Sequence, residues 1–223
     1  MSGTDGVTGP ETPGGGAVRR RAVVARPPAV VVAGPPGCGK STTGARLARQ
    51  AGRLGLPLAV LDQDTMTGPL TRVVARQAGR PDDLDAPDVR ALIREPTYEA
   101  LLGVAGDVMR SGVGCVLVAP FTGERRDPQR WRELESRLRD GGAGRIVLMW
   151  VTCPPGILLG RLRARDAPRD RAKLADPAWL HTLDLARPAV PHVPVDAAVP
   201  RAELDEQLGA VLARLGRAVR AST

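Results

Sequence analysis

The sequence predicts an α/β fold in which helices cover both faces of a central five-stranded parallel sheet. Short apolar runs alternate along the chain with longer stretches of helical character, as in stacked βα units. The runs are continuously apolar, as strands buried on both faces usually are. The length of 223 residues suits one such domain with a single hydrophobic core.

Five apolar runs, most of them bounded by Gly or Pro, are expected to be the strands. They span residues 29–33, 58–61, 113–119, 146–151 and 192–195. Helices are expected to begin near Lys40, Pro96, Pro128, Pro155, Pro177 and Pro200. Proline suits these starts because the first turn of a helix needs no backbone N–H. Residues 62–95 contain several Gly and Pro, so we expect broken helix and loop there, forming a substrate lobe.

The N-terminal segment differs in composition from the rest of the chain. Residues 1–27 are rich in Gly, Pro and Thr and have almost no periodicity, so they cannot bury enough apolar area to offset chain entropy. We expect a disordered leader over 1–27 and the folded domain over 28–217. An alternative for the short apolar patch 22–25 is an added edge strand.

Composition argues against several classes of protein. No apolar run approaches the roughly 20 residues of a membrane span, and the N-terminus lacks the apolar region of a signal peptide. The cysteines Cys38, Cys115 and Cys153 are odd in number and lack paired metal spacing, which argues against a disulfide framework and against zinc. We therefore expect a cytoplasmic protein without a membrane partner, as a monomer or a homodimer.

The formal net charge of +8 would ordinarily suggest a nucleic-acid partner. Lysine occurs only at Lys40 and Lys173, and the arginines are spread over the whole chain, a pattern typical of high-GC codon bias. Aromatic residues make up only 2% of the chain, which leaves little platform for stacking bases. A nucleic-acid partner is therefore not expected.

The segment GPPGCGKS from Gly34 to Ser41 fits the phosphate-loop pattern G-x-x-x-x-G-K-[ST], and it follows a predicted strand and opens a predicted helix. Its glycines allow successive N–H groups to point inward around phosphates, and the helix N-terminus adds partial positive charge. We expect Lys40 to bridge the terminal phosphates of ATP and Ser41 to bind Mg²⁺. The residues expected to hold the nucleotide are Gly34, Pro35, Pro36, Gly37, Cys38, Gly39, Lys40, Ser41 and Thr42.

Two carboxylates follow the second predicted strand, in Leu61-Asp62-Gln63-Asp64. Ligands of open parallel sheets bind beyond the carboxyl ends of the strands, so these acids should face the nucleotide. If the strand continues, both lie on one face, where either could accept a proton from a substrate hydroxyl or orient Mg²⁺. We expect Asp64 to act as the base, with Asp62 in reserve and near the substrate and metal. The alternative is a helix N-cap or turn.

The third predicted strand ends in Ala119-Pro120-Phe121, without the acid that motor and switch NTPases place there. Its absence favours a kinase that takes its acid from the second strand. Phe121 is expected to wall the substrate pocket. Arg125 or Arg126 could contact an anionic group, the alternative being a solvated helix start.

Arginines recur in two later contexts. Residues 161–171 contain five of them, and an arginine on a closing lid would stabilise the charge that phosphoryl transfer spreads over oxygen atoms. We expect Arg165 and Arg169 to be these lid residues. Arg94 and Tyr98 are candidate substrate contacts because they would follow Arg90 at four-residue spacing on a helix, although Pro96 is expected to break it.

Together, GPPGCGKS, the LDQD and APF runs and the Arg-rich segment resemble the small P-loop kinases, which include adenylylsulfate kinase, gluconate kinase and chloramphenicol phosphotransferase. The resemblance covers about residues 28–215 and implies a P-loop NTPase three-layer sandwich with an Arg-rich lid. Adenylylsulfate kinases have a similar L-D-G-D run, by which Asp64 matches their base. Here Gln63 replaces the Gly and the K-G-L-Y lid run is absent. Residues 161–174 are similar to uncharacterised bacterial ATP-binding P-loop proteins.

The function expected from these residues is transfer of the γ-phosphoryl group of ATP to a hydroxyl of a small molecule, with Mg²⁺ as the cofactor. Adenine is expected near residues 196–200. Two alternatives remain open at this point. One is a polynucleotide 5′-hydroxyl kinase or nucleic-acid-dependent ATPase, and the other is a regulatory module that binds ATP without catalysis.

Overall fold

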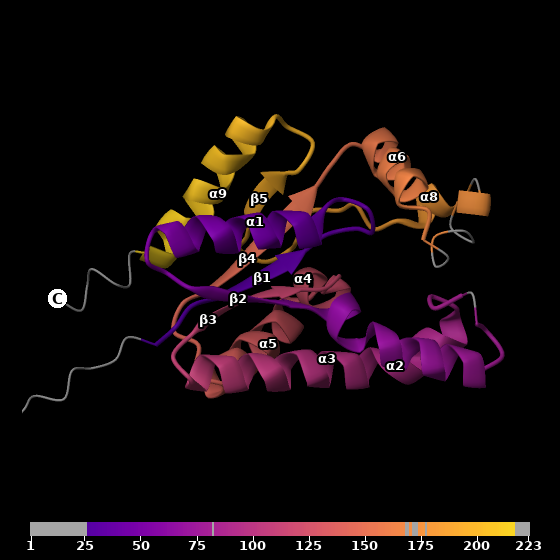
Figure 1. Ribbon diagram of the computed structural model, residues 1–223, viewed down its shortest axis with the longest axis horizontal. Coiled ribbons are helices and arrows are strands. Elements are labelled where there is room, and N and C mark those ends of the chain that lie inside the picture. The colour runs from indigo at the N-terminus through magenta and orange to yellow at the C-terminus, as the bar shows by residue number, and fades with distance from the viewer. Residues whose placement is uncertain (1–25, 82, 168–169, 171–173, 177, 217–223) are drawn as a thin grey trace, which may run out of the picture.

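The computed structural model of the chain describes residues 26–81, 83–167, 170, 174–176 and 178–216 (Figure 1). Its centre is a five-stranded sheet in the order β2-β3-β1-β4-β5, and every pair of neighbouring strands is parallel. The strands are β1 (Ala29–Ala33), β2 (Leu58–Asp62), β3 (Gly114–Val118), β4 (Ile146–Thr152) and β5 (Val193–Asp196). The five predicted strands are confirmed, with ends that differ by a residue at most.

Helices cover both faces of this sheet, as Figure 1 shows. Helices α1 (Lys40–Arg53) and α9 (Arg201–Gly216) lie on one face, and α3 (Pro87–Arg110) and α5 (Pro128–Asp140) lie on the other. Side chains alternate across β1, so Val30 packs into the core that contains α1 and α9, and Val31 into the core that contains α3 and α5. The predicted three-layer sandwich is confirmed.

The segment between β2 and β3 differs from the prediction. Helix α2 (Gln63–Gln77) runs through Pro69, and α3 begins at Pro87 and runs through Pro96 for 24 residues. The connection between α2 and α3 confirms the loop predicted within 62–95, but Pro69 does not break α2, and the helix start predicted at Pro96 is wrong. Pro96 is exposed and removes only one backbone hydrogen bond, which tertiary packing offsets. Apolar contacts hold the outer ends of α2 and α3 together, around Ala75, Ala86 and Val89.

The structure also describes three shorter helices, which are α4 (Thr122–Arg126), α6 (Pro155–Arg165) and α8 (Trp179–Thr182). The helix predicted near Pro177 is represented by α8, and Pro177 itself lies outside the described residues. Residues 1–25 also lie outside them, so the leader, the edge strand over 22–25 and the domain boundary stay predictions. In the part of the chain that is described, no helix combines the length and apolar character needed to cross a membrane.

Arg125 supports the fold and does not face a cavity, so the prediction that it contacts an anionic ligand is wrong. Its side chain is buried, lies 4.4 Å from the centre of the Trp150 ring, and donates hydrogen bonds to the Ala186 carbonyl and to Asp184. Arg126 also pairs with Asp184, from an exposed position. The pair of arginines therefore attaches the segment before β5 to the end of α4.

We expect Arg125→Ala to lower the free energy of unfolding by about 3 kcal/mol, because it removes one partner of a buried ion pair. The control is Arg126→Ala, which removes the exposed partner of the same carboxylate and should cost much less, because solvent screens an exposed ion pair. Urea unfolding of the two variants measures the difference. Equal losses would contradict the structural role assigned to Arg125.

Candidate active site

The phosphate loop joins β1 to α1 in the strand–loop–helix context that the sequence predicts. Gly39 is the N-cap of α1 and adopts φ 102°, a left-handed conformation that favours glycine. At Gly34, a Cβ atom would lie 2.3 Å from the Val151 carbonyl oxygen, so only glycine fits between β1 and β4. These two glycines let the loop turn tightly and present its backbone to the cavity.

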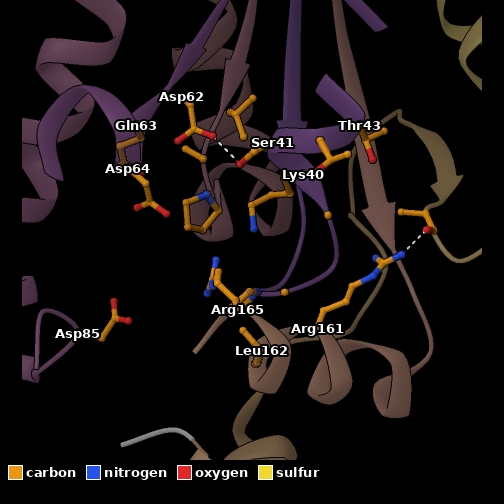
Figure 2. Close-up of a pocket in the computed structure, with 18 of the residues that line it drawn as sticks. Lys40, Ser41, Thr43, Asp62, Gln63, Asp64, Asp85, Arg161, Leu162 and Arg165 are labelled. Carbon is orange, nitrogen blue, oxygen red and sulfur yellow. Dashed lines mark hydrogen bonds between the residues drawn. The ribbon is translucent and has the colours of Figure 1, made fainter. Parts of the chain in front are cut away.

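Lys40 lies inside this loop (Figure 2). Its Nζ donates hydrogen bonds to the carbonyl oxygens of Gly34 and Pro35, both at 2.9 Å. The ammonium group is therefore held over the loop. From there it could also donate hydrogen bonds to the oxygen atoms of a phosphate chain. Of the other predicted loop residues, Pro36, Gly37, Gly39, Ser41 and Thr42 line the cavity.

Cys38 belongs to the loop but points away from the cavity into the core beneath α1 and α6. Burial raises the pKa of its thiol above the ordinary value, and the nearby Lys40 charge only partly offsets this. The thiol therefore stays protonated at neutral pH, and the Cys38 side chain does not line the cavity, although Cys38 is among the residues expected to hold the nucleotide.

Asp62 connects β2 to the phosphate loop. Its Oδ2 accepts a hydrogen bond of 2.5 Å from the Ser41 hydroxyl, and its Oδ1 accepts one of 3.2 Å from the Thr65 N–H as the N-cap of α2. The alternative interpretation, a helix N-cap, is confirmed for Asp62. The hydroxyl and the carboxylate also form a pair of oxygen ligands of the kind Mg²⁺ prefers. The described residues contain no cluster of three or more His, Cys, Asp or Glu, so further ligands would be phosphate oxygens and water.

Asp64 does not share a strand face with Asp62, because β2 ends at Asp62 and α2 begins at Gln63. The expectation of a continued strand is wrong. The first turn of α2 instead carries Asp64 to the cavity shown in Figure 2, and Asp64 also lines a second cavity. Because the backbone changes from strand to helix between them, Asp62 lies beside the phosphate loop and Asp64 lies where the two cavities join.

Two cavities meet at the end of β2. The first, of about 610 Å³, is lined by the phosphate loop, α6 and the segment after β5. The second, of about 700 Å³, lies between α2 and α3. Both are lined by Gln63, Asp64, Asp85 and Pro120. A ligand in one cavity could therefore touch a ligand in the other.

Arg161 closes the far side of the first cavity. Its guanidinium donates to the Cys38 carbonyl at 2.8 Å and to the Ala197 carbonyl at 2.6 Å. It thereby ties α6 both to the phosphate loop and to the segment after β5, where adenine is predicted. Ala197 and Leu204 line the cavity there, and they give an apolar surface next to the loop.

Arg165 lies one helical turn beyond Arg161 and lines the first cavity. Its Nε and Nη2 donate to Oδ2 of the fully buried Asp170, at 2.8 and 2.5 Å. This pair holds the guanidinium at the cavity edge opposite Asp64. Arg169 lies outside the described residues, so its role, like the closing of a lid, stays a prediction.

Tyr98 and Arg94 line the second cavity, because α3 continues through Pro96 and the predicted polar stripe forms on one helix. The Arg94 guanidinium lies 5.4 Å from the centre of the Tyr98 ring. Burial raises the pKa of Tyr98 above its ordinary value, and the charge of Glu124 adds to this effect. The phenol is therefore neutral at pH 7 and can only donate or accept hydrogen bonds.

Phe121 is not a wall of either cavity, and the prediction that it contacts substrate is wrong. Its backbone adopts φ 45°, and its fully buried ring packs edge-on against Tyr98 at 5.4 Å. Its N–H donates to the Tyr98 hydroxyl at 2.9 Å. Phe121 thus positions Tyr98 from behind, while its neighbours Pro120 and Thr122 face the second cavity.

Asp85 is a candidate site residue that the sequence analysis missed. It comes from the connection between α2 and α3, and Figure 2 shows its carboxylate turned toward the cavity that Asp64 also lines. The acid-rich run Asp82-Asp83-Leu84-Asp85 was the only signal in the sequence. This run could not be assigned to the site from the sequence, because its position depends on how α2 and α3 place the connection between them.

The comparisons with known proteins agree with this architecture. A family model described as an AAA domain matches residues 30–189. The gluconokinase of Sinorhizobium meliloti 1021 is 23% identical, with a TM-score of 0.53 over 89% of this chain and 98% of that one. The APS kinase of Mycobacterium tuberculosis, in complex with AMPPNP and APS, is 20% identical, with a TM-score of 0.55 over 85% and 98%.

A putative kinase from Chloroflexus aurantiacus is 18% identical, with a TM-score of 0.56 over 89% of this chain and 99% of that one. At these identities the similarity is evidence for a shared fold alone. The comparison with curated proteins found no match.

Proposed function

Because this chain belongs to the AAA domain family and has the fold of the small P-loop kinases, we propose that it transfers the γ-phosphoryl group of ATP to a hydroxyl of a small molecule. The proposal assigns ATP to the first cavity and the hydroxyl acceptor to the second. The γ-phosphoryl group and the acceptor hydroxyl would come together where the two cavities join.

The observation that carries this proposal is the position of Asp64. It lines both the cavity of the phosphate loop and the cavity between α2 and α3. A carboxylate at that boundary can contact an acceptor hydroxyl beside the terminal phosphate, as a general base requires. A module that only binds nucleotide needs neither the second cavity nor an acid between the two.

The phosphate loop would bind the triphosphate through its backbone N–H groups and through Lys40. Ser41 and Asp62 would hold Mg²⁺, whose chemistry is to neutralise the charge on the β and γ oxygens. Ala197 and Leu204 would contact the adenine, and Arg161 would keep that wall attached to the loop.

In the transfer step, the acceptor oxygen forms a bond to the γ-phosphorus while the bond from that phosphorus to the β–γ bridging oxygen breaks. The proton of the acceptor hydroxyl passes to the Asp64 carboxylate, and ADP leaves with the electron pair of the broken bond. Arg165 would stabilise the charge on the oxygens of the transferred group, from the position in which Asp170 holds it. A closed, dry site makes such a contact stronger than it is in water.

Incubation of the purified protein with γ-labelled ATP, Mg²⁺ and a panel of hydroxyl-bearing metabolites and antibiotics tests the proposal. We expect a labelled phosphoester product with at least one compound. Parallel reactions with DNA and RNA address the nucleic-acid alternative, which predicts ATP turnover that is stimulated by the polymer and falls steeply with salt. Tight ATP binding without transfer to any compound or to water would contradict the proposal and favour a non-catalytic module.

A further inference from the structure

Three arginines line the second cavity. Arg72 comes from α2, and Arg90 and Arg94 come from α3. The lining also includes two carboxylates, Asp64 and Asp85, and both of these line the first cavity as well. The rest of the lining is apolar or neutral, so arginines outnumber carboxylates in the second cavity and its lining has a net positive charge.

Ion pairing with carboxylates divides the arginines of the described part of the chain into two groups. Nine other arginines there form an ion pair with a carboxylate. Arg72, Arg90 and Arg94 form none within the described residues, although Arg94 packs over the Tyr98 ring. Like charges one turn apart on α3 repel each other, and an anion between the helices would relieve that repulsion.

The spacing of residues along α2 and α3 shows how far the three arginines lie from Asp64. A hydrogen bond of 2.7 Å from Gln63 to Thr97 fixes α2 beside α3 at the inner end of the cavity. Arg72 follows Asp64 by eight residues on α2, which is roughly 12 Å along a helix axis. Because α3 runs back toward the sheet, Arg94 lies about one turn outward from Thr97, and Arg90 lies a turn farther out.

We propose that the acceptor carries an anionic group as well as its reacting hydroxyl, and that Arg90 and Arg94, with Arg72 facing them, bind that group. This inference rests on the proposed function. A guanidinium matches the geometry of an oxyanion and can donate two parallel hydrogen bonds to it. The substrate class is therefore a hydroxy acid or a phosphate or sulfate ester, with about 5 to 12 Å between the hydroxyl and the anion.

The first test is transfer from γ-labelled ATP to matched pairs of acceptors. Gluconate is compared with glucitol and glycerate with glycerol, which separates a carboxylate from its neutral counterpart. Glucose 6-phosphate and glucose 6-sulfate are each compared with glucose, which tests whether a phosphate ester or a sulfate ester is preferred to the neutral sugar. We expect kcat/KM to be at least about a hundredfold higher for the anionic member of the accepted pair, given two charge-assisted contacts. A preference for neutral members would overturn the inference and leave the kinase proposal standing.

The second test uses Arg90→Gln and Arg94→Gln. Each should raise the KM for the anionic acceptor about ten- to a hundredfold, and change kcat and the KM for ATP little. Arg76→Gln is the matched control, because Arg76 lies on α2 one turn beyond Arg72, is exposed and lines neither cavity. An unchanged acceptor KM in both Arg variants would overturn the inference.

The third test does not depend on turnover. Equilibrium dialysis measures the binding of labelled inorganic sulfate to protein saturated with AMPPNP and Mg²⁺, which keeps sulfate out of the phosphate loop. We expect one sulfate site that is lost in the Arg90→Gln/Arg94→Gln double variant and kept in Arg76→Gln, with thermal unfolding near that of the wild type in all three. Sulfate binding that survives in the double variant overturns the inference. Loss of that binding without any phosphoryl transfer would support the anion site and contradict the kinase.

Discussion

Lys40→Ala is expected to lower phosphoryl transfer by about a thousandfold and to weaken ATP binding. The physical reason is that Lys40 is the charged side chain inside the phosphate loop, where its Nζ lies 2.9 Å from two loop carbonyls. Removing one preorganised charge from a site where transition-state charge develops typically costs a factor of 10² to 10³. Rates of labelled product formation and titration with a fluorescent ATP analogue measure the two effects.

The variant should fold normally, because Lys40 is only partly buried and its hydrogen bonds are made to the loop itself. Arg49→Ala is the matched control. It removes an exposed cation from the same helix, α1, and Arg49 lines neither the first nor the second cavity. If Lys40→Ala keeps wild-type ATP affinity and transfer, the interpretation of the loop as a nucleotide site is wrong.

Asp64→Asn is expected to reduce transfer by 10²- to 10⁴-fold, the range typical of a lost general base, and to leave ATP affinity nearly unchanged. The amide keeps the size of the side chain at the boundary of the two cavities but cannot accept the hydroxyl proton. Single-turnover transfer with the accepted compound and ATP titration separate the two quantities. Equal rates for the variant and the wild type would show that Asp64 is not the base.

Asp88→Asn is the control for this substitution. Asp88 is also an acid in the first turn of a helix, α3, but it lines neither cavity and pairs with the exposed Arg80. Any general effect of removing an acid near a helix N-terminus should appear in both variants. Only a role in chemistry predicts loss of transfer in Asp64→Asn alone.

Several features of the fold and the site could be predicted because their signals are local. The phosphate loop is recognisable from Gly34 to Ser41 because each glycine and Lys40 act within a few residues of one another along the chain. Strands β1, β3 and β4 are recognisable because a strand buried on both faces must be apolar at nearly every position. The acids after β2 could be associated with the site because parallel strands end at a common edge.

Other features depend on partners that are distant in the sequence. Phe121 is adjacent to two cavity residues, but its left-handed backbone turns the ring against Tyr98. Arg125 resembles an anion-binding arginine, and its partner Asp184 comes 59 residues later. Asp85 reaches the boundary of the cavities only because α2 and α3 bring the connection between them back to it.

The sequence alone thus determined the sheet, the phosphate loop and the identity of the acids that follow β2. The tertiary structure decided that α3 continues through Pro96, that Asp64 lies between two cavities, and that α2 and α3 enclose the second of them. The reason is one of scale. Backbone preferences and apolar patterns act over a few residues, whereas the cost of a proline in a helix or the contacts of an arginine depend on what the rest of the chain packs against it.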